Sequence, residues 1–243
     1  MEYVLNKVQD FKIYTRKDRR DQDMNVVREV IIGDHYRVAK LSRFIQPKVI
    51  LDIGGHIGTF GILVKTYWPD SLLIAVEPNK ISYGLYQMNM KANNYKNYHI
   101  INAAVGYDKN KTVLTNGFTA TGGGFITTLE EAKKLKNYRI IDTNVTLITV
   151  EEIIDKFNID KIELSKWDCE GGEIEIIKNI KSDYTSKFLC IVGEYHLPGG
   201  KSSFIPLFKS KFKHLDVYCR RTDNFHIGSF IAYNDNRLKD AYR

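Results

Sequence analysis

The sequence contains few cysteines and no long apolar run. Its three cysteines, Cys169, Cys190 and Cys219, are an odd number, lie far apart and form no C-x-x-C pair. This pattern argues against a disulfide framework and a zinc knuckle, and it predicts a reducing, cytoplasmic location. We expect Cys190 to be a small core residue, because it lies in the apolar run FLCIVG.

The apolar runs are all shorter than the roughly 18 to 20 residues that span a bilayer, so we expect no membrane insertion. Charged residues interrupt the apolar stretches of MEYVLNKVQDFKIYTRKDRR, so we expect no signal peptide either. Hydrophobic residues make up 43% of the chain, charged residues 27%, and the mean hydropathy is −0.32. This composition indicates one globular domain rather than a disordered segment.

The net charge is +7, because 36 Lys and Arg outnumber 29 Asp and Glu. A basic surface attracts anionic partners such as nucleic acid, but it also occurs simply as a solvated face. The charge by itself leaves both interpretations open.

Glycine and proline divide the chain into short strands that alternate with helical stretches. Strands are predicted at residues 48–54, 71–78, 97–106, 160–168 and 188–196, and helices at 57–68, 81–93, 150–157 and 171–180. The last two strand-like runs, HLDVYC and GSFIAYN, are predicted to be antiparallel neighbours. The pattern indicates an α/β fold with a doubly wound, mostly parallel sheet of about seven strands that ends in an antiparallel hairpin.

Two segments lie outside this pattern. Residues 1–46 mix both charges and are expected to form a cap or an oligomer contact, whereas residues 47–243 form the main domain. Within that domain, residues 107–144 are β-prone, rich in Thr and Asn, and contain three consecutive glycines at 122–124. We interpret them as an insertion, with the glycines forming either a lid over a site or a surface turn.

The run DIGGHIG at residues 52–58 stands where a buried strand turns into a helix. Glycines there let the backbone approach a ligand, and N–H groups at the start of the helix can bind an anion. Its spacing is not G-x-G-x-x-G, since His56 takes the second glycine's place, and no G-K-S/T follows. The sequence therefore argues against an NAD or FAD site and against a P-loop.

Polar residues follow the next two strands. Glu77 comes about 20 residues after the glycine turn, where a carboxylate can accept hydrogen bonds from the hydroxyls of a ribose. Asn102 ends the third strand, where its amide could meet an adenine edge or act as a turn residue.

A further cluster, WDCEGGE at residues 167–173, lies between a strand and a helix, and GEYH at 193–196 closes the following strand. Asp168 and Glu170 could orient a substrate hydroxyl, stabilise a positive charge or hold a metal, although we predict no metal ligand set. Glu170 could also serve only as a favourable charge at the start of a helix, and Glu173 is expected on the helix surface. His196 is a plausible general base near neutral pH.

Five motifs, DIGGHIG, VEPN, INAAVG, WDCEGGEIEII and VGEYH, resemble in this order those of FkbM-type S-adenosylmethionine-dependent methyltransferases, over about residues 47–234. The resemblance implies a class I methyltransferase (Rossmann-like) fold that binds S-adenosyl-L-methionine. The implied cofactor-binding residues are Asp52, Gly54, Gly55, His56, Gly58, Glu77, Asn102, Ala103 and Asp168, with ribose on Glu77, adenine near Asn102 and Ala103, and the methyl end near Asp168. Gly55 and His56 replace a small residue and an Asn of the usual loop, so contacts in this turn are expected to differ.

The resemblance favours O-methylation of a hydroxyl on a small molecule or glycan. We assign Asp168, Glu194 and His196 as catalytic candidates for proton acceptance or hydroxyl orientation, with His196 the most natural base, and Glu170 and His196 as substrate contacts. Two alternatives stay open: an RNA (ribose) methyltransferase, suggested by the charge of +7, and a non-catalytic protein that binds S-adenosylmethionine. No D/N/S-P-P-Y/F/W element is present, which argues against methylation of base amines. The oligomeric state is left open.

Overall fold

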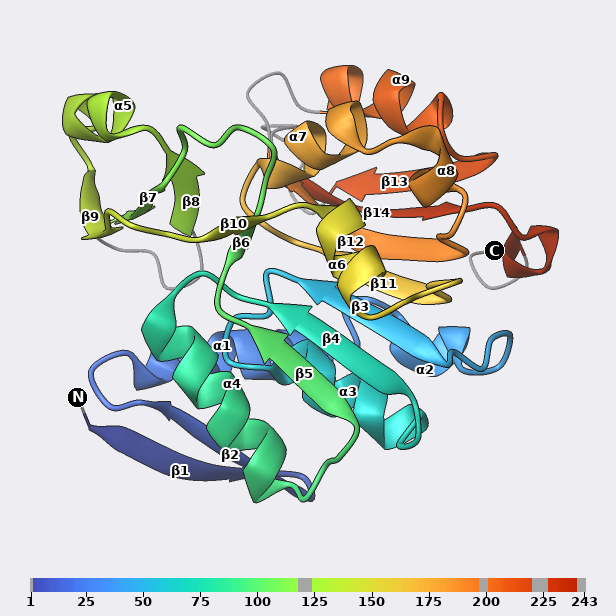
Figure 1. The fold of residues 1–243 in the computed structure, drawn as a ribbon. Coiled ribbons are helices and arrows are strands. Elements are labelled where there is room, and N and C mark those ends of the chain that lie inside the picture. The colour runs from blue at the N-terminus through green and yellow to red at the C-terminus, as the bar shows by residue number, and fades with distance from the viewer. Residues whose placement is uncertain (1, 118–123, 197–200, 220–226, 240–243) are drawn as a thin grey trace.

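A computed structural model of the chain describes residues 2–117, 124–196, 201–219 and 227–239. At its centre is a seven-stranded sheet with the order β13-β14-β12-β11-β3-β4-β5 (Figure 1). The strands are β3 (Val49–Ile53), β4 (Leu72–Val76), β5 (Tyr98–Ile101), β11 (Leu164–Trp167), β12 (Cys190–His196), β13 (His214–Cys219) and β14 (Ile227–Tyr233). Of these, only β14 runs antiparallel to its neighbours β12 and β13. The predicted α/β class, the number of strands and the mostly parallel sheet are confirmed.

Alternate residues of the central strands face two separate hydrophobic cores. Ile50 of β3 packs into one core together with α3 (Thr59–Tyr67) and α4 (Lys80–Ala92), whereas the next residue, Leu51, packs into the other. The second core contains α6 (Val150–Lys156), α7 (Gly172–Asn179) and α9 (Lys201–Lys209), and the short α8 (Ser182–Thr185) follows α7 in the chain. This arrangement explains why the strands read as continuous apolar runs, since both of their faces are buried. Figure 1 shows the two helical layers on opposite faces of the sheet.

The first 46 residues fold back onto the α3–α4 layer. They form β1 (Tyr3–Val8), β2 (Phe11–Arg16), α1 (Arg20–Val27), the π-helix η1 (Arg28–Ile32) and α2 (Val38–Leu41). Ile13, Val27 and Leu41 are completely buried in the same core as α3. Asn89 of α4 links this segment to the turn before α3. Its Oδ1 accepts the N–H of Tyr14 at 2.6 Å, and its Nδ2 donates to the carbonyl of Ile57 at 2.8 Å. The segment therefore shares the main core, and a role in oligomer contacts stays a prediction.

One predicted strand proves to be two. The run at 97–106 was expected to be continuous, but β5 ends at Ile101 and β6 (Ala104–Val105) leaves the main sheet to pair in parallel with β10 (Leu147–Ile148). A tight turn, in which the N–H of Ala103 donates to the carbonyl of Ile101 at 3.0 Å, separates them. The third strand is consequently followed by the insertion and not directly by a helix.

The insertion forms its own antiparallel sheet with the order β8-β7-β9. It consists of β7 (Val113–Gly117), β8 (Gly124–Thr127), α5 (Leu129–Lys134) and β9 (Tyr138–Asp142). Of the three glycines at 122–124, Gly124 opens β8 and the other two lie outside the described residues. Figure 1 shows this small sheet standing beside the carboxyl ends of the central strands.

The remaining observations concern the cysteines, the end of the chain and membrane spans. Cys190 is buried in β12 with a free thiol, as predicted. The side chain of Cys219 and the segment 220–226 that joins β13 to β14 lie outside the described residues, and the 3₁₀ turn η2 (Asn236–Leu238) follows β14. Within the described ranges, no helix combines the length and apolar character that crossing a membrane requires.

Candidate functional site

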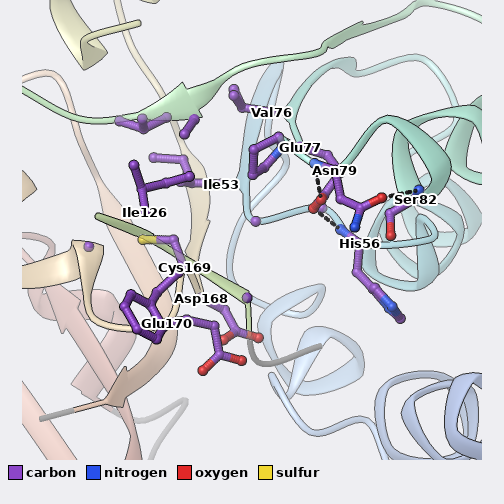
Figure 2. A pocket seen from close by; sticks show the side chains of 18 of the residues that line it. Ile53, His56, Val76, Glu77, Asn79, Ser82, Ile126, Asp168, Cys169 and Glu170 are labelled. Carbon is purple, nitrogen blue, oxygen red and sulfur yellow. Dashed lines mark hydrogen bonds between the residues drawn. The ribbon is translucent and has the colours of Figure 1, made fainter. Parts of the chain in front are cut away.

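A cavity of about 480 Å³ opens at the carboxyl ends of β3, β4, β11 and β12 (Figure 2). Its walls also include residues of the N-terminal segment, such as His35 and Tyr36, and of the insertion, such as Leu114 and Ile126. The carboxyl edge of a parallel sheet is where open α/β folds bind their ligands. The volume lies within the range of small-molecule and cofactor sites.

The glycine turn brings the backbone of β3 against the backbone of β11. Gly54 has a φ of 77°, and a Cβ at this position would lie 1.8 Å from the carbonyl oxygen of Asp168. Only glycine fits this left-handed conformation and close approach. Gly58, with a φ of 90°, instead makes room for the ring of Tyr86, 2.4 Å from its notional Cβ, and does not line the cavity.

Glu77 lies at the floor of the cavity and is 7% exposed. Its Oε2 accepts the N–H of His56 at 2.8 Å and its Oε1 accepts the N–H of Asn79 at 2.9 Å, as Figure 2 shows. Burial raises the pKa of Glu77 to about 7, although these two hydrogen bonds oppose the shift. Each carboxylate oxygen can accept a second hydrogen bond, so Glu77 retains capacity for two hydroxyl donors.

The side chain of His56 points away from Glu77 (Figure 2). Its Nε2 lies 3.0 Å from a guanidinium nitrogen of Arg16 and 3.7 Å from Asp23. Burial and the charge of Arg16 lower the pKa of His56 to about 4, so the ring is neutral at pH 7. Because arginine only donates, Nε2 accepts and Nδ1 carries the hydrogen. His56 thus connects the glycine turn to the buried Arg16–Asp23 pair of the N-terminal segment.

Besides Gly58, two of the predicted cofactor contacts do not line the cavity. Asp52 is completely buried and accepts hydrogen bonds from the hydroxyl of Tyr86 at 2.9 Å and from Lys166 at 3.2 Å. Asn102 donates from Nδ2 to the carbonyls of Glu77 at 2.9 Å and Pro78 at 3.0 Å. Neither lines the cavity, and both hold the turns in place; direct contact of either residue with the cofactor stays a prediction. The predicted residues that do line it are Gly54, Gly55, His56, Glu77, Ala103 and Asp168.

The predicted catalytic and substrate residues come together elsewhere in the cavity, and Figure 2 shows Asp168 and Glu170 on the side away from Glu77. The Nε2 atom of His196 lies 3.6 Å from Glu170, 3.7 Å from Glu194 and 4.0 Å from Asp168. On the other side of the ring, Nδ1 lies 3.6 Å from Glu173. Asp168, Glu170, Glu194 and His196 therefore form a single group, which we call the acidic cluster.

Ionisation within the acidic cluster differs from the sequence-based expectation. Burial alone would lower the pKa of His196, but the carboxylates of Glu173, Glu170 and Asp168 outweigh burial and raise it to about 10. Burial raises the pKa of Glu170 to about 7, with His196 opposing. Burial would also raise the pKa of Asp168, but Lys166, His196 and Tyr36 hold it below its usual value. At neutral pH the imidazole is thus charged, and Glu170 is the group poised to gain or lose a proton.

Glu173 was expected on the helix surface, but it is completely buried. Its two oxygens accept the N–H groups of Cys169 at 2.7 Å and Gly171 at 3.0 Å. These bonds fix the loop in which Glu170 adopts a φ of 54°, a conformation that non-glycine residues rarely take. Glu173 therefore positions the loop that carries Glu170.

Three residues of the site were missed by the sequence analysis. Lys166, 4% exposed, donates to the carbonyl of Gly54 at 2.7 Å and to Asp52 at 3.2 Å, and lies 3.8 Å from Asp168. Tyr36 donates to Asp168 at 2.7 Å, and His35 pairs with Glu194 at 2.9 Å. A lysine inside a buried strand was a usable signal, because such a charge requires buried partners. Nothing local in the sequence distinguished His35 or Tyr36.

Two sets of side chains have the spacing that a metal ion requires. In each set, Glu29 with His35 and Glu194, and Asp168 with Glu173 and His196, the ligand atoms lie within 4.8 Å of one another. His35 already pairs with Glu194, Asp168 accepts from Tyr36, and Glu173 accepts two backbone N–H groups. His35, Glu194, Asp168 and Glu173 therefore already have partners within the protein.

Comparison with known proteins connects this geometry to one family. Residues 52–224 match the family model described as the Methyltransferase FkbM domain. Methyltransferase 1 of Beauveria bassiana (strain ARSEF 2860) is 23% identical over 196 residues, which cover 74% of this chain and 78% of that protein. Methyltransferase sdnD of Sordaria araneosa is 21% identical over 199 residues, covering 72% and 75%. Among solved structures, an rRNA methylase from Streptococcus thermophilus has a TM-score of 0.50 at 7% identity, covering 83% of this chain and 96% of that one, a likeness of fold.

Proposed function

Because the chain belongs to the FkbM methyltransferase family and is an S-adenosylmethionine-dependent methyltransferase, we propose that it methylates a hydroxyl group of a small molecule or glycan. The observation that carries the proposal is the acidic cluster in the same cavity as Glu77 and the glycine turn. Carboxylates there can accept hydrogen bonds from the hydroxyls of an acceptor and take up the proton that such an acceptor releases. The family assignment does not favour the non-catalytic alternative.

The residues of the cavity fit the cofactor. Gly54 and Gly55 of the glycine turn line the cavity without side chains, and Glu77 keeps capacity for two hydroxyl donors. Bound S-adenosylmethionine supplies an electrophilic methyl group, so the protein mainly aligns the acceptor and excludes water. We assign the ribose hydroxyls to Glu77 and the adenine surroundings to Ala103.

Within the acidic cluster, we assign proton acceptance to Glu170 rather than to His196. With a pKa of about 10, His196 is already protonated at neutral pH, so the base role predicted for it needs revision. Glu170 faces the cavity, and its pKa of about 7 suits a base near neutrality. Asp168, held by Tyr36, and Glu194, held by His35, would orient the acceptor hydroxyl.

The charge of the cavity disfavours the RNA alternative. Glu29, Asp168, Glu170 and Glu194 line the part of the cavity near the N-terminal segment. The positive charges of Lys166 and the protonated His196 offset these four carboxylates only in part. A phosphodiester would meet repulsion from these carboxylates, whereas a neutral polyol would not. The net charge of +7 resides outside this part of the cavity, so it does not argue for RNA as the acceptor.

A reducing, cytoplasmic location stays a prediction.

The test has two stages. Calorimetry with S-adenosylmethionine should show binding that weakens about tenfold or more in Glu77→Ala; no binding to the unaltered protein would contradict the cofactor assignment. Labelled S-adenosylmethionine should then be incubated with a panel of hydroxylated small molecules and oligosaccharides, and in parallel with RNA. NMR of the labelled product should show an O-methyl group. An N-methyl product, or label in RNA alone, would overturn the acceptor proposal.

A further inference from the structure

Among the described residues that line the cavity, three have a buried polar atom without a hydrogen-bond partner: Nδ1 of His56, Nδ1 of His196 and Oδ1 of Asn116. Only that of Asn116 is an acceptor on the insertion sheet. Asn116 of β7 lines the cavity and is only 5% exposed. Its Oδ1 atom is fully buried and accepts no hydrogen bond. A buried acceptor without a donor destabilises the folded protein, so such an atom in a cavity wall calls for a donor from a ligand.

The strand pairing places Asn116 on the cavity side of β7. Residues two apart in a strand share a face, and Leu114 and Asn116 both line the cavity. Thr115, between them, does not line it and instead donates from its hydroxyl to the carbonyl of Phe125 at 3.2 Å. Asn116 pairs with Gly124 of β8, the strand that also brings Ile126 to the cavity.

Two contacts put this wall near Glu77 and Ala103. Leu114 belongs to a small apolar cluster with Ala104 and Leu147, so the face of β7 covers the chain directly after Ala103. At the other edge of the insertion sheet, Asp142 of β9 forms an ion pair at 2.7 Å with Lys80, three residues after Glu77. The insertion sheet is thus fastened beside the part of the cavity to which we assign the ribose and adenine.

The chemistry of the wall matches an adenine ring. Leu114 and Ile126 offer apolar surface, and Asn116 offers one unused acceptor. Adenine presents a flat apolar surface and one exocyclic amino group that only donates. Asn102, the residue that the sequence suggested for this edge, lies behind the wall with its own amide donating to the backbone.

We propose that Oδ1 of Asn116 accepts a hydrogen bond from the exocyclic amino group of the cofactor's adenine, and that Leu114 and Ile126 cover the ring. The proposal rests on the cofactor assignment made above. It gives the insertion a part in recognising the nucleoside, in addition to any part in selecting the acceptor.

Calorimetry with two nucleosides tests the proposal without a methyl acceptor. The full-length protein is titrated with S-adenosylhomocysteine and with S-inosylhomocysteine, in which a carbonyl oxygen replaces the amino group. The unaltered protein should prefer the adenosyl compound about tenfold or more, because the inosyl oxygen would face Oδ1 of Asn116. In Asn116→Leu the two affinities should come within about threefold, whereas Asn116→Asp, which keeps an acceptor, should retain the preference.

Two controls make the outcomes distinct. Glu77→Ala should weaken binding of both nucleosides by the same factor, so the ratio of the two affinities stays unchanged. Asn144→Ala, at an exposed position of the same insertion, should change neither affinity. The proposal is overturned if Asn116→Leu and Asn116→Asp both keep the ratio of adenosyl to inosyl affinity that the unaltered protein shows. Failure of the unaltered protein to bind either nucleoside would instead contradict the cofactor assignment. Melting temperatures of each variant verify folding.

Discussion

The hydroxyl of Tyr36 donates a hydrogen bond to Oδ2 of Asp168 at 2.7 Å across 132 residues of sequence. Tyr36 is 3% exposed, and Lys166 lies 3.8 Å from the same Oδ2 atom. Asp168 is thereby fixed in one orientation at the carboxyl end of β11 by the N-terminal segment. Residues 1–46 thus take part in building the cavity.

Replacing Tyr36 by Phe should slow methyl transfer while leaving cofactor affinity nearly unchanged. The ring would still fill its buried position, but Asp168 would lose a donor, which is worth about 1 kcal/mol of stability. That loss corresponds to a fall of about 2–4 °C in melting temperature for a chain of this size. Turnover measured with the acceptor found by labelled-methyl screening should fall about tenfold. Turnover equal to that of the unaltered protein would show that the orientation of Asp168 does not matter.

Gly54→Ala should destabilise the protein and abolish cofactor binding. The added methyl group would lie 1.8 Å from the carbonyl oxygen of Asp168 at a φ of 77°, so the turn and the end of β11 must separate. We expect a loss of about 2 kcal/mol or more, read as a fall of at least about 4 °C in melting temperature.

Gly84→Ala is the matched control for that substitution. Gly84 lies inside α4, and nothing lies within 4 Å of its notional Cβ. Alanine is the better helix former by about 0.8–1.0 kcal/mol, so this variant should melt at a higher temperature. If both variants melted below the unaltered protein by equal amounts, the close approach at Gly54 would not explain its requirement for glycine.

The positions where strands end were predictable because their signals are local. The runs KVILDIG and SLLIAVEP each combine a buried strand with the turn that follows, and β3 and β4 end one and two residues before the predicted ends at 54 and 78. The prediction carried the strand at β5 too far because the apolar pattern continues through Ala103. In the structure the chain turns there, and β6 pairs with β10. A pairing partner more than 40 residues away leaves no mark on a local pattern.

The ionisation states could not be read from the sequence. A histidine next to one carboxylate and a histidine among four carboxylates look alike in the run GEYH, yet only the second stays protonated at neutral pH. The burial of Glu173 was likewise hidden, because its partners are backbone N–H groups of the loop before α7. Such properties arise from the folded arrangement rather than from residue type.

Cofactor affinity should depend on pH through Glu77. Its pKa is raised to about 7, so the carboxylate is ionised above that pH and protonated below it. An ionised carboxylate is the stronger acceptor for hydroxyl groups, so affinity for S-adenosylhomocysteine should fall as the pH decreases from 8 to 6. The charge of Lys166 favours ionisation of Glu77, and the nearby Asp52 opposes it.

Glu77→Gln is the variant that checks this origin. The amide cannot titrate, so calorimetry at several pH values should give a weaker affinity that no longer changes near pH 7. A pH dependence that persists unchanged in Glu77→Gln would assign the titration to another group of the cavity.

Glu170→Gln should reduce turnover about 10²- to 10⁴-fold, the usual contribution of a general base. The glutamine keeps the size of the side chain but cannot accept the proton of the acceptor hydroxyl. In the unaltered protein, turnover should rise with pH through about 7, because Glu170 becomes ionised there. Burial raises this pKa most, His196 of β12 lowers it, and the carboxylates of Asp168, Glu173 of α7 and Glu194 of β12 raise it further.

His196→Gln separates Glu170 from its charged neighbour. Loss of the imidazolium removes the contact that favours the ionised form of Glu170, so the rise of turnover should shift to higher pH rather than vanish. Glu130→Gln, on the exposed helix α5, should leave the profile unchanged. If the rise instead disappeared in His196→Gln and persisted in Glu170→Gln, the imidazole would be the base after all, and the charge assigned to it would be wrong.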